Sequence, residues 1–309
     1  MTSLTTAIES APPGTGARPS RLRAVLANGA VRAGGAILGV MLFLAVAAPW
    51  LYTIDPNTMD PASSQLAPFT RAEIVTLAGD AFERLFPLGT DSLGRDIWSR
   101  TLFGARVSLA VGVSVALASV LLGLAVGLVS GYVRWLDGFI MRVMDGMMAI
   151  PGILFAIVLV AAWRPSLLTV IVAMTVPDTP RVARLVRSVV LSVREEPYVE
   201  AAIALDTPTW KLMLRHILPN TIAPLLVQGT FICAGAMLVE AVMSFLGIGL
   251  PTDIPTWGNI MAEGRAHFTA HPHSVLLPGA FLAVTVLAVN MLGDGLRDTL
   301  DPKFSKRSA

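Results

Sequence analysis

Three histidines form the most conspicuous group of residues that could do chemistry. His267, His271 and His273 lie close together in the segment before the last apolar run. Imidazole is a good ligand for nickel and other divalent metals. Their spacing matches no defined metal motif, however, and no cysteine stands near them in the sequence. We therefore predict no bound metal and no cofactor.

Signatures of phosphate binding and of catalysis are also missing from the sequence. A phosphate-binding loop ends in Gly-Lys-Ser or Gly-Lys-Thr, and none of the lysines Lys211, Lys303 and Lys306 follows a glycine. An enzyme that acts within a membrane needs a nucleophile or paired acids there, and we find no such pair. We predict that the chain is not an enzyme and that any ATP is hydrolysed by another protein.

The composition indicates that these residues are positioned by a membrane protein. The chain has 309 residues, of which 54% are hydrophobic and only 14% are charged, and its mean hydropathy is +0.68. A soluble domain normally carries about a quarter charged residues. The net charge of +2 is spread along the chain, which argues against a nucleic-acid partner. The single cysteine, Cys233, lies inside an apolar run and is expected to be a buried small hydrophobe.

Long apolar runs are the strongest structural signal. A helix needs about 20 apolar residues to cross a bilayer. Two of the runs are interrupted at Pro151, Pro177 and Pro180, and prolines are tolerated in spans when neighbours satisfy the freed carbonyls. We therefore predict an all-α polytopic fold with six transmembrane helices. Their expected ranges are 33–54, 107–133, 146–163, 166–193, 222–246 and 274–293.

Positive charge predicts the orientation of these spans. Most of the 23 lysines and arginines fall in segments that are cytoplasmic if the N-terminus is cytoplasmic. We expect an inner-membrane protein with both termini in the cytoplasm. A cleaved signal peptide ending near Ala47 is the less favoured alternative, because the apolar run continues past it. The expected order is a disordered tail (1–32), a first transmembrane helix (33–54), an extracytoplasmic segment (55–106), a core transmembrane domain (107–295) with a cytoplasmic loop (194–220), and a C-terminal tail (296–309).

The loop 194–220 is the most polar interruption in the second half of the chain. Pro197 suits the first turn of a short helix, because its missing amide costs nothing there. Two turns are unstable alone in water, so this helix must pack against another surface. The residues expected to share one of its faces are Tyr198, Ala201, Ala202 and Leu205.

A second short helix is expected to complete a helix-turn-helix elbow beside the membrane. Thr207 is its expected cap and Pro208 its first residue. It should carry Trp210, Leu214 and Ile217 toward a break at Leu218-Pro219-Asn220.

At this loop the sequence resembles the permease subunits of binding-protein-dependent ABC importers. Their signature begins Glu-Ala-Ala and continues through a glycine to His-x-Leu-Pro-Asn. This chain has Asp206 where the family usually has glycine, and aspartate tolerates left-handed backbone geometry better than most residues. The resemblance implies a coupling helix that inserts into a groove on a separate ATPase subunit. The residues given this role are Glu200, Ala201, Ala202, Asp206, His216, Pro219 and Asn220.

A second motif precedes the second span. The segment from Leu88 to Asp96 is similar to the N-terminal signature of the dipeptide, oligopeptide and nickel permease branch, and it implies the C-type subunit of the permease pair. Its acidic and basic residues are expected to form a local ion-pair cluster at the outer face, with a structural role favoured over substrate contact. The motif residues are Gly89, Thr90, Asp91, Gly94, Arg95 and Asp96.

Two features place charge within the predicted spans. Glu240 lies inside an apolar run, so it either faces the transport pathway or makes a structural hydrogen bond between helices. Arg181, Arg184 and Arg187 recur every third residue, which suits a cytoplasmic interface or lipid phosphates, although a solvated or lipid-facing stripe is favoured.

The resemblance covers about residues 85 to 302 and implies the type I fold of ABC importer permeases. It implies that the chain forms half of a translocation pathway together with a second homologous permease, two ATPase subunits and an extracytoplasmic binding protein. Peptides are the expected substrates, and nickel, glutathione or another small solute are the alternatives. An ion-coupled secondary transporter is a further rival, but it should show inverted repeats and mid-membrane charges, which are not evident apart from Glu240.

Overall fold

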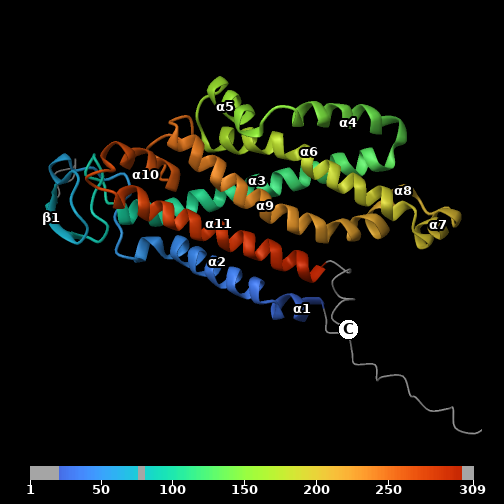
Figure 1. Cartoon of the computed structure of the whole chain (residues 1–309), viewed down its shortest axis with the longest axis horizontal. Coiled ribbons are helices and arrows are strands. Elements are labelled where there is room, and N and C mark those ends of the chain that lie inside the picture. The colour runs from blue at the N-terminus through green and yellow to red at the C-terminus, as the bar shows by residue number, and fades with distance from the viewer. Residues whose placement is uncertain (1–20, 76–80, 301–309) are drawn as a thin grey trace, which may run out of the picture.

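Helices aligned along one long axis make up most of the structure. The computed structural model describes residues 21–75 and 81–300. The short helices α7 (Pro197–Ala204) and α8 (Thr209–Leu212) lie at one end of this axis, and the strands and α10 (Trp257–Gly264) lie at the other (Figure 1). We call these the α7 end and the hairpin end. The predicted helical membrane fold is confirmed.

Four helices in the described residues are long and apolar enough to cross a membrane. Helices α4 (Arg134–Met148) and α5 (Gly152–Ala162) are bent by 85° and make a fifth candidate if the pair counts as one span. The single run predicted at 146–163 is therefore wrong in its bounds, because Pro151 separates two helices. The four long helices are α2 (Gly29–Ala47, continued by a 3-10 turn at Ala48–Trp50), α3 (Ile97–Tyr132), α9 (Leu218–Phe245) and α11 (His273–Leu300).

Helix α6 (Leu167–Arg194) has 28 residues, which is enough to cross a membrane, but it carries too many charges to be recognised by hydropathy. It runs from beside α5 to the α7 end (Figure 1). Pro177 and Pro180 lie within it, as expected. Together with α6, the four long helices and the bent pair follow one another in the chain order predicted for the six spans.

The second span begins earlier than the sequence indicated. Helix α3 starts at Ile97 instead of residue 107, with Asp96 as its N-cap. Its first turns carry Ser99, Arg100 and Thr101, all buried inside the protein. Hydropathy treats such residues as unfit for a span, whereas here protein atoms and not lipid surround them. The predicted extracytoplasmic segment 55–106 therefore includes the start of a long helix.

The chain is helical from Arg21, so the disordered tail predicted over 1–32 is wrong for its last residues. Helix α1 (Arg21–Ala27) precedes α2, whose N-cap Asn28 accepts hydrogen bonds from the amides of Ala30 and Val31. Val31 is buried beside Gly295 of α11, so tertiary packing holds this segment. Residues 1–20 and 301–309 of the predicted tails lie outside the described residues.

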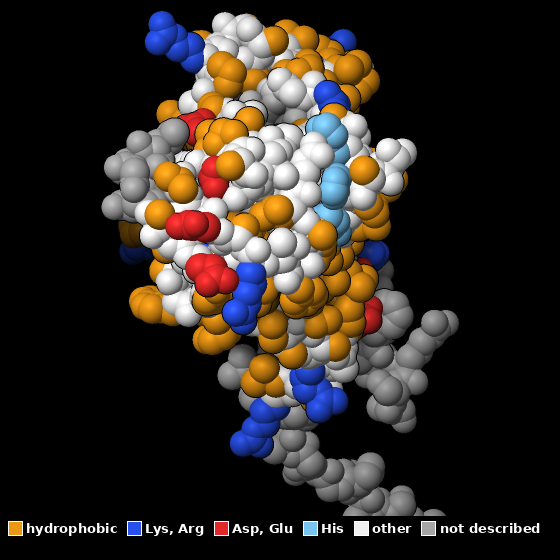
Figure 2. Space-filling model, turned by 90° about the vertical axis from the view of Figure 1, so that its left-hand side faces the viewer, with side chains coloured by type: hydrophobic (Ala, Val, Ile, Leu, Met, Phe, Trp, Pro, Cys, Tyr) orange, Lys and Arg blue, Asp and Glu red, His pale blue; other side chains and the backbone are white. Residues whose placement is uncertain are grey.

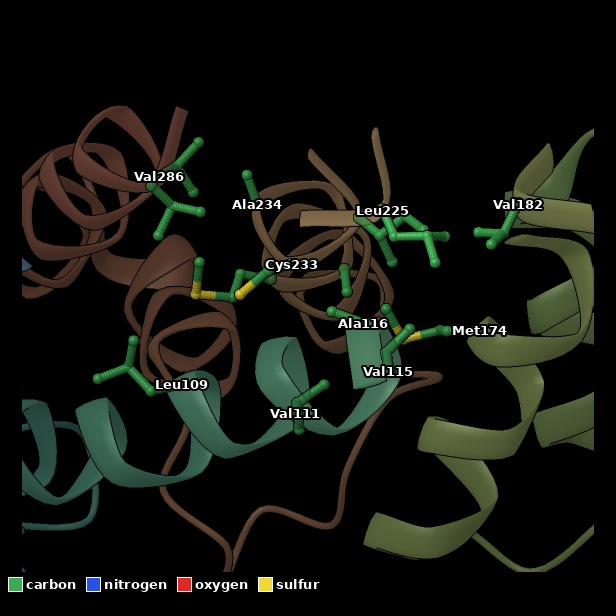
Figure 3. Packing of buried hydrophobic residues seen from close by; sticks show 14 of the residues in the cluster. Leu109, Val111, Val115, Ala116, Met174, Val182, Leu225, Cys233, Ala234 and Val286 are labelled. Atoms are coloured by element: carbon green, nitrogen blue, oxygen red, sulfur yellow. The ribbon is translucent and has the colours of Figure 1, made fainter. Parts of the chain in front are cut away.

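Glycines on α3 set the closest helix contact of the core. Gly123, Gly127 and Gly131 recur every fourth residue, and an added Cβ at each would collide with a valine of α6. The valines are Val182, Val186 and Val190, in the same order, so the two helices run parallel. Small residues with this spacing let helix backbones approach closely in membranes. Figure 3 shows the adjoining core, where Val115 of α3, Met174 of α6 and Leu225 of α9 converge.

A two-stranded hairpin adds β structure that the sequence did not predict. Strands β1 (Thr70–Val75) and β2 (Ala81–Phe86) pair antiparallel, with Thr70 opposite Phe86. Ile74 of β1 and Phe86 of β2 are buried. Helix α10 packs beside this region, and its buried Trp257 donates an indole hydrogen bond of 3.1 Å to the carbonyl of Thr101 on α3.

Candidate functional site

Helix α7 presents a largely exposed surface at its end of the molecule. It begins at Pro197 as predicted, one short turn after α6. Val199 and Ala202 are its buried residues and hold it against the bundle. Tyr198 and Leu205 are exposed, the latter at 82%. The prediction that Ala202 shares a face with Tyr198 is therefore wrong. Ala202 faces the bundle, on the same side of α7 as Val199.

The two remaining signature residues of α7 are free of the bundle. Glu200 and Ala201 are both exposed. Glu200 lies in the first turn of the helix, where a negative charge is stabilised by the helix dipole. Ala201 offers a small side chain beside it, so a partner surface could approach the backbone closely.

Asp206 terminates α7 in the left-handed conformation that the sequence suggested. Its φ is +54°, and its amide bonds to the carbonyl of Ile203 at 2.9 Å. The next amide, that of Thr207, bonds to the carbonyl of Ala202 at 3.1 Å. This pair of bonds is the Schellman motif, in which glycine is the usual residue at the left-handed position. The prediction that Asp206 preserves the turn is confirmed.

The second half of the elbow differs from the prediction. Helix α8 starts at Thr209 with Pro208 as its N-cap residue and no side-chain cap hydrogen bond, so the predicted cap at Thr207 and the predicted first residue, Pro208, are each wrong by one position. A π-helical turn (Met213–Ile217) then leads directly into α9, so the expected break at Leu218 is wrong. The wider turn accommodates Pro219 without interrupting the helix. Such π turns are often found at functional sites.

The His-x-Leu-Pro-Asn residues connect α9 to α7. The side-chain amide of Asn220 donates to the Tyr198 hydroxyl at 3.2 Å and to the His216 carbonyl at 2.6 Å. The His216 ring lies 6.1 Å from the Tyr198 ring, centroid to centroid. Of the three residues that the second helix was expected to carry, Trp210 and Leu214 are exposed, whereas Ile217 is buried. The structure thus brings the end of the signature against Tyr198, which lies two residues before the signature begins.

The motif at the hairpin end forms a buried ion-pair network. The Arg95 guanidinium bonds to Asp91 at 2.7 Å and also to Glu263 of α10. Arg100 is fully buried and bonds to Glu263 at 3.3 Å and to the carbonyls of Pro56 and Thr252. The network therefore ties the segment around Pro56 to α3 and to α10.

Asp96 belongs to a different ion pair from the one predicted. It accepts from Arg84 of β2 at 3.0 Å and caps α3 through the amides of Trp98 and Ser99. Burial raises the pKa of the Asp96 carboxyl group, and the nearby Arg84 opposes this shift. Burial likewise raises the pKa of Glu263, opposed by Arg100 and Arg95. The arginine partners therefore help to keep both carboxyl groups ionised.

The other motif residues shape the chain around this network. Gly89 and Gly94 both have φ of +73°, and added side chains there would collide with the carbonyls of Leu66 and Asp60. The Thr90 hydroxyl donates to the Ser63 carbonyl at 2.5 Å and accepts from the Leu66 amide at 2.8 Å. These contacts are internal to the protein.

A family description now fits the chain from the middle of α3 onward. "Binding-protein-dependent transport system inner membrane component" matches residues 119–306, which include the whole elbow. The chain belongs to this family. It is therefore a membrane permease subunit of an ABC transporter.

Similar proteins extend the match beyond that region. A probable peptide ABC transporter permease protein from Sinorhizobium fredii is 47% identical over 274 residues, which cover 89% of each chain. A putative peptide transport system permease protein from Brucella abortus is 41% identical over 306 residues, covering 98% of this chain and 99% of the relative. A chain of the MetNI methionine ABC transporter in an inward-facing conformation has the same fold, with a TM-score of 0.51 at 19% identity, covering 63% of this chain and 94% of that one.

Glu240 of this permease subunit is not on an exposed surface. It is 1% exposed in α9, and its Oε1 accepts a hydrogen bond of 2.8 Å from Ser244 one turn later in the same helix. Thr256, the N-cap residue of α10, lies beside the Glu240 carboxyl group as a further hydrogen-bonding side chain. The burial of Glu240 and these polar neighbours favour the structural alternative over the pathway alternative, and a hydrogen bond between helices stays a prediction.

The arginines of α6 are paired with acids that sequence spacing did not reveal. Arg187 makes two bonds of 2.5 Å to Asp137 of α4, and Arg184 bonds to Asp145 of α4 at 2.6 Å. Arg181 pairs with Asp178 on its own helix at 3.4 Å. Two of the three arginines therefore fasten α4 to α6.

The histidines of the predicted group lie together at the hairpin end, whereas His216 is at the α7 end. Figure 2 looks onto this end and shows histidine side chains in a single band, away from most of the acidic residues. The rings of His271 and His273 are 5.8 Å apart, centroid to centroid, in an edge-to-face arrangement. Within residues 21–75 and 81–300, no three His, Cys, Asp or Glu side chains are grouped to hold a metal ion.

Proposed function

We propose that this permease subunit forms half of the translocation pathway of an ATP-driven peptide importer, and that α7 is the element through which separate ATPase subunits move it. The names of the Sinorhizobium and Brucella relatives support the substrate class. The observation that carries the coupling role is the exposed face of α7, where Glu200 and Ala201 project beyond the bundle on a firmly anchored helix.

The anchoring of α7 suits it to transmit force. Arg194, at the end of α6, donates to the carbonyls of Gly131 and Tyr132 at the end of α3. On the other side, α8 continues through the π turn into α9. A push or pull on α7 therefore reaches three long helices through covalent continuity and hydrogen bonds.

The role proposed for α7 also fixes the orientation. ATP is in the cytoplasm, so the α7 end is cytoplasmic and the hairpin end faces outward. The N-terminal helix α1 and the end of α11 lie toward the α7 end in Figure 1, which favours cytoplasmic termini. A substrate-binding protein then docks at the hairpin end, and a second homologous permease completes the pathway.

Transport follows from alternating access. Closure of the two ATPases on ATP draws the α7 helices of the permease pair together and opens the pathway outward. Hydrolysis reverses the movement. ATP can drive this change only if the ATPases bind it more tightly in one state than in the other.

Bulk on the exposed face of α7 tests the coupling role. The measurement is ATP-driven dipeptide uptake by proteoliposomes that contain the chain, its permease partner, the ATPases and the binding protein. Ala201→Trp should abolish uptake while the amount of chain in the membrane stays unchanged. Ala36→Trp, at an exposed position of α2, is the matched control and should transport normally. Normal uptake by Ala201→Trp would rule out the coupling role.

A further inference from the structure

The packing of α6 against α3 fixes the rotation of α6 about its own axis. Val182, Val186 and Val190 occupy the space above the glycines of α3, and all three are fully buried. Rotating α6 by even a quarter of a turn would lift these valines out of the glycine groove. The directions of all other side chains of α6 are therefore fixed as well.

Two charged side chains reach the surface halfway along this helix. Arg181 points away from the valine row, and Asp178 lies one turn before Val182 at the end of that row. Arg181 is 61% exposed and Asp178 is 25% exposed at their side chains. At a rise of about 1.5 Å per residue, Arg181 lies about 20 Å from either end of α6. In a membrane-spanning helix this position is near the middle of the bilayer.

Lipid is an unfavourable environment for this arginine. A charged side chain at the bilayer centre costs at least about 3 kcal/mol, so such residues face a water-filled cavity or a protein partner. Arg184 and Arg187 are already paired with acids of α4, which neutralises them. Arg181 has, among the described residues, one ion pair, which joins its Nη1 to Asp178 Oδ1 at 3.4 Å.

The Asp178–Arg181 pair differs from the two α4 pairs in ways that suit exchange of partners. It is longer, it is more exposed at the arginine, and it joins residues one turn apart on a single helix, so opening it moves no other element. An exposed pair of this kind is only weakly stabilising. A ligand with opposite charges at its two ends could replace both interactions.

We propose that Asp178 and Arg181 contact the charged ends of the peptide as it passes through the membrane. The guanidinium of Arg181 is suited to bidentate hydrogen bonds with the terminal carboxylate. The carboxylate of Asp178 is suited to the terminal ammonium group. Because every unblocked peptide has these ends, the contact selects the substrate class and not a particular side chain. This inference rests on the proposed function and adds a substrate contact to it.

Blocked peptides separate this contact from other roles of the arginine. The experiment compares ATP-driven uptake of a dipeptide with that of its C-terminal amide, in the complete reconstituted complex. For each variant, the ratio of dipeptide uptake to amide uptake is divided by the same ratio in the wild type. Any preference of the binding protein for one of the two substrates then cancels. Arg181→Gln should lower uptake of the free dipeptide about tenfold and leave uptake of the amide nearly unchanged. Asp178→Asn should likewise lower uptake of the free dipeptide and leave uptake of an N-acetylated dipeptide nearly unchanged.

A charge-conserving variant keeps the test decisive. Arg181→Lys preserves the charge, should assemble normally and should retain part of the discrimination, because lysine keeps the charge but not the bidentate geometry. An equal loss for the free and amidated dipeptides in Arg181→Gln would mean that the arginine contacts the second permease or only supports the fold, and it would overturn the inference. Unchanged uptake of both would overturn it too. If the wild-type complex transports no peptide at all, it is the proposed function that fails.

Discussion

The side-chain nitrogen of Asn220 lies 3.2 Å from the Tyr198 hydroxyl and 2.6 Å from the His216 carbonyl, and so links the first turn of α9 to the first turn of α7. Tyr198 lies on α7, whereas His216 and Asn220 are four residues apart where the π turn continues into α9. Their contact holds the exposed face of α7 in one orientation relative to the long helices. The orientation of that face is therefore set by side chains as well as by the Schellman turn.

Loss of the Asn220 contacts should weaken coupling without preventing membrane insertion. Asn220→Ala removes two hydrogen bonds, each worth about 0.5–1.5 kcal/mol, and should lower ATP-driven uptake severalfold. Tyr198→Phe removes one of them and should have a smaller effect. Uptake and the amount of chain in the membrane are measured together. A Tyr198→Phe defect larger than that of Asn220→Ala would contradict this account.

The stability of the elbow should depend on how well residue 206 tolerates a left-handed backbone. Asp206→Gly removes the steric cost of positive φ and should slow hydrogen exchange of the α7 amides. Asp206→Val adds a β-branched side chain at φ +54° and should destabilise the turn by about 1–2 kcal/mol, with faster exchange. Exchange in α11 is the internal control. Equal exchange in the two variants would mean that the Schellman turn does not limit the opening of α7.

The glycine groove on α3 should be intolerant of any side chain. A Cβ at Gly127 would lie 2.6 Å from both the Val186 Cβ and the Ala183 carbonyl, so Gly127→Ala should destabilise the protein by about 1–3 kcal/mol. A Cβ at Gly39 of α2 meets nothing within 4 Å, and Gly39→Ala is the matched control, expected to be neutral or stabilising. Thermal unfolding in detergent measures both. The same melting temperature for the two variants would be inconsistent with the parallel packing of α3 and α6.

The ion pairs at the hairpin end should contribute strongly to stability. Arg100→Met leaves Glu263 with one fewer partner in a buried site, and breaking a buried pair costs about 3–5 kcal/mol. Arg71→Met removes an exposed arginine of β1 and should change the stability by less than about 0.5 kcal/mol. Thermal unfolding again provides the comparison, and a small effect of Arg100→Met would show that this network is not a structural clamp.

Sequence patterns identified those features that depend on local chemistry. Apolar runs located the long helices because a bilayer requires about 20 such residues, and Pro197 and Asp206 marked the start and end of α7 because their backbone preferences are local. The elbow signature was likewise recognisable as a string of residues.

Features that depend on contacts between distant parts of the chain could not be predicted from the sequence. Arg95 and Glu263 are 168 residues apart, and nothing in the sequence pairs them. The early start of α3 and the charges of α6 contradict simple hydropathy, since their polar side chains are satisfied by other parts of the protein. The inward turn of Ala202 was missed because the neighbouring Val199, and not Tyr198, faces the bundle.

The central claim is that α7 is held by a separate ATPase on the cytoplasmic side. A single cysteine tests it directly, because Cys233 is the one native cysteine, is buried, and can be replaced by alanine. In that background, a cysteine introduced at Ala201 should cross-link to the ATPase in the assembled complex and should resist an impermeant maleimide added outside intact cells. Labelling of position 201 from outside, or no cross-link to the ATPase in an active complex, would contradict the account.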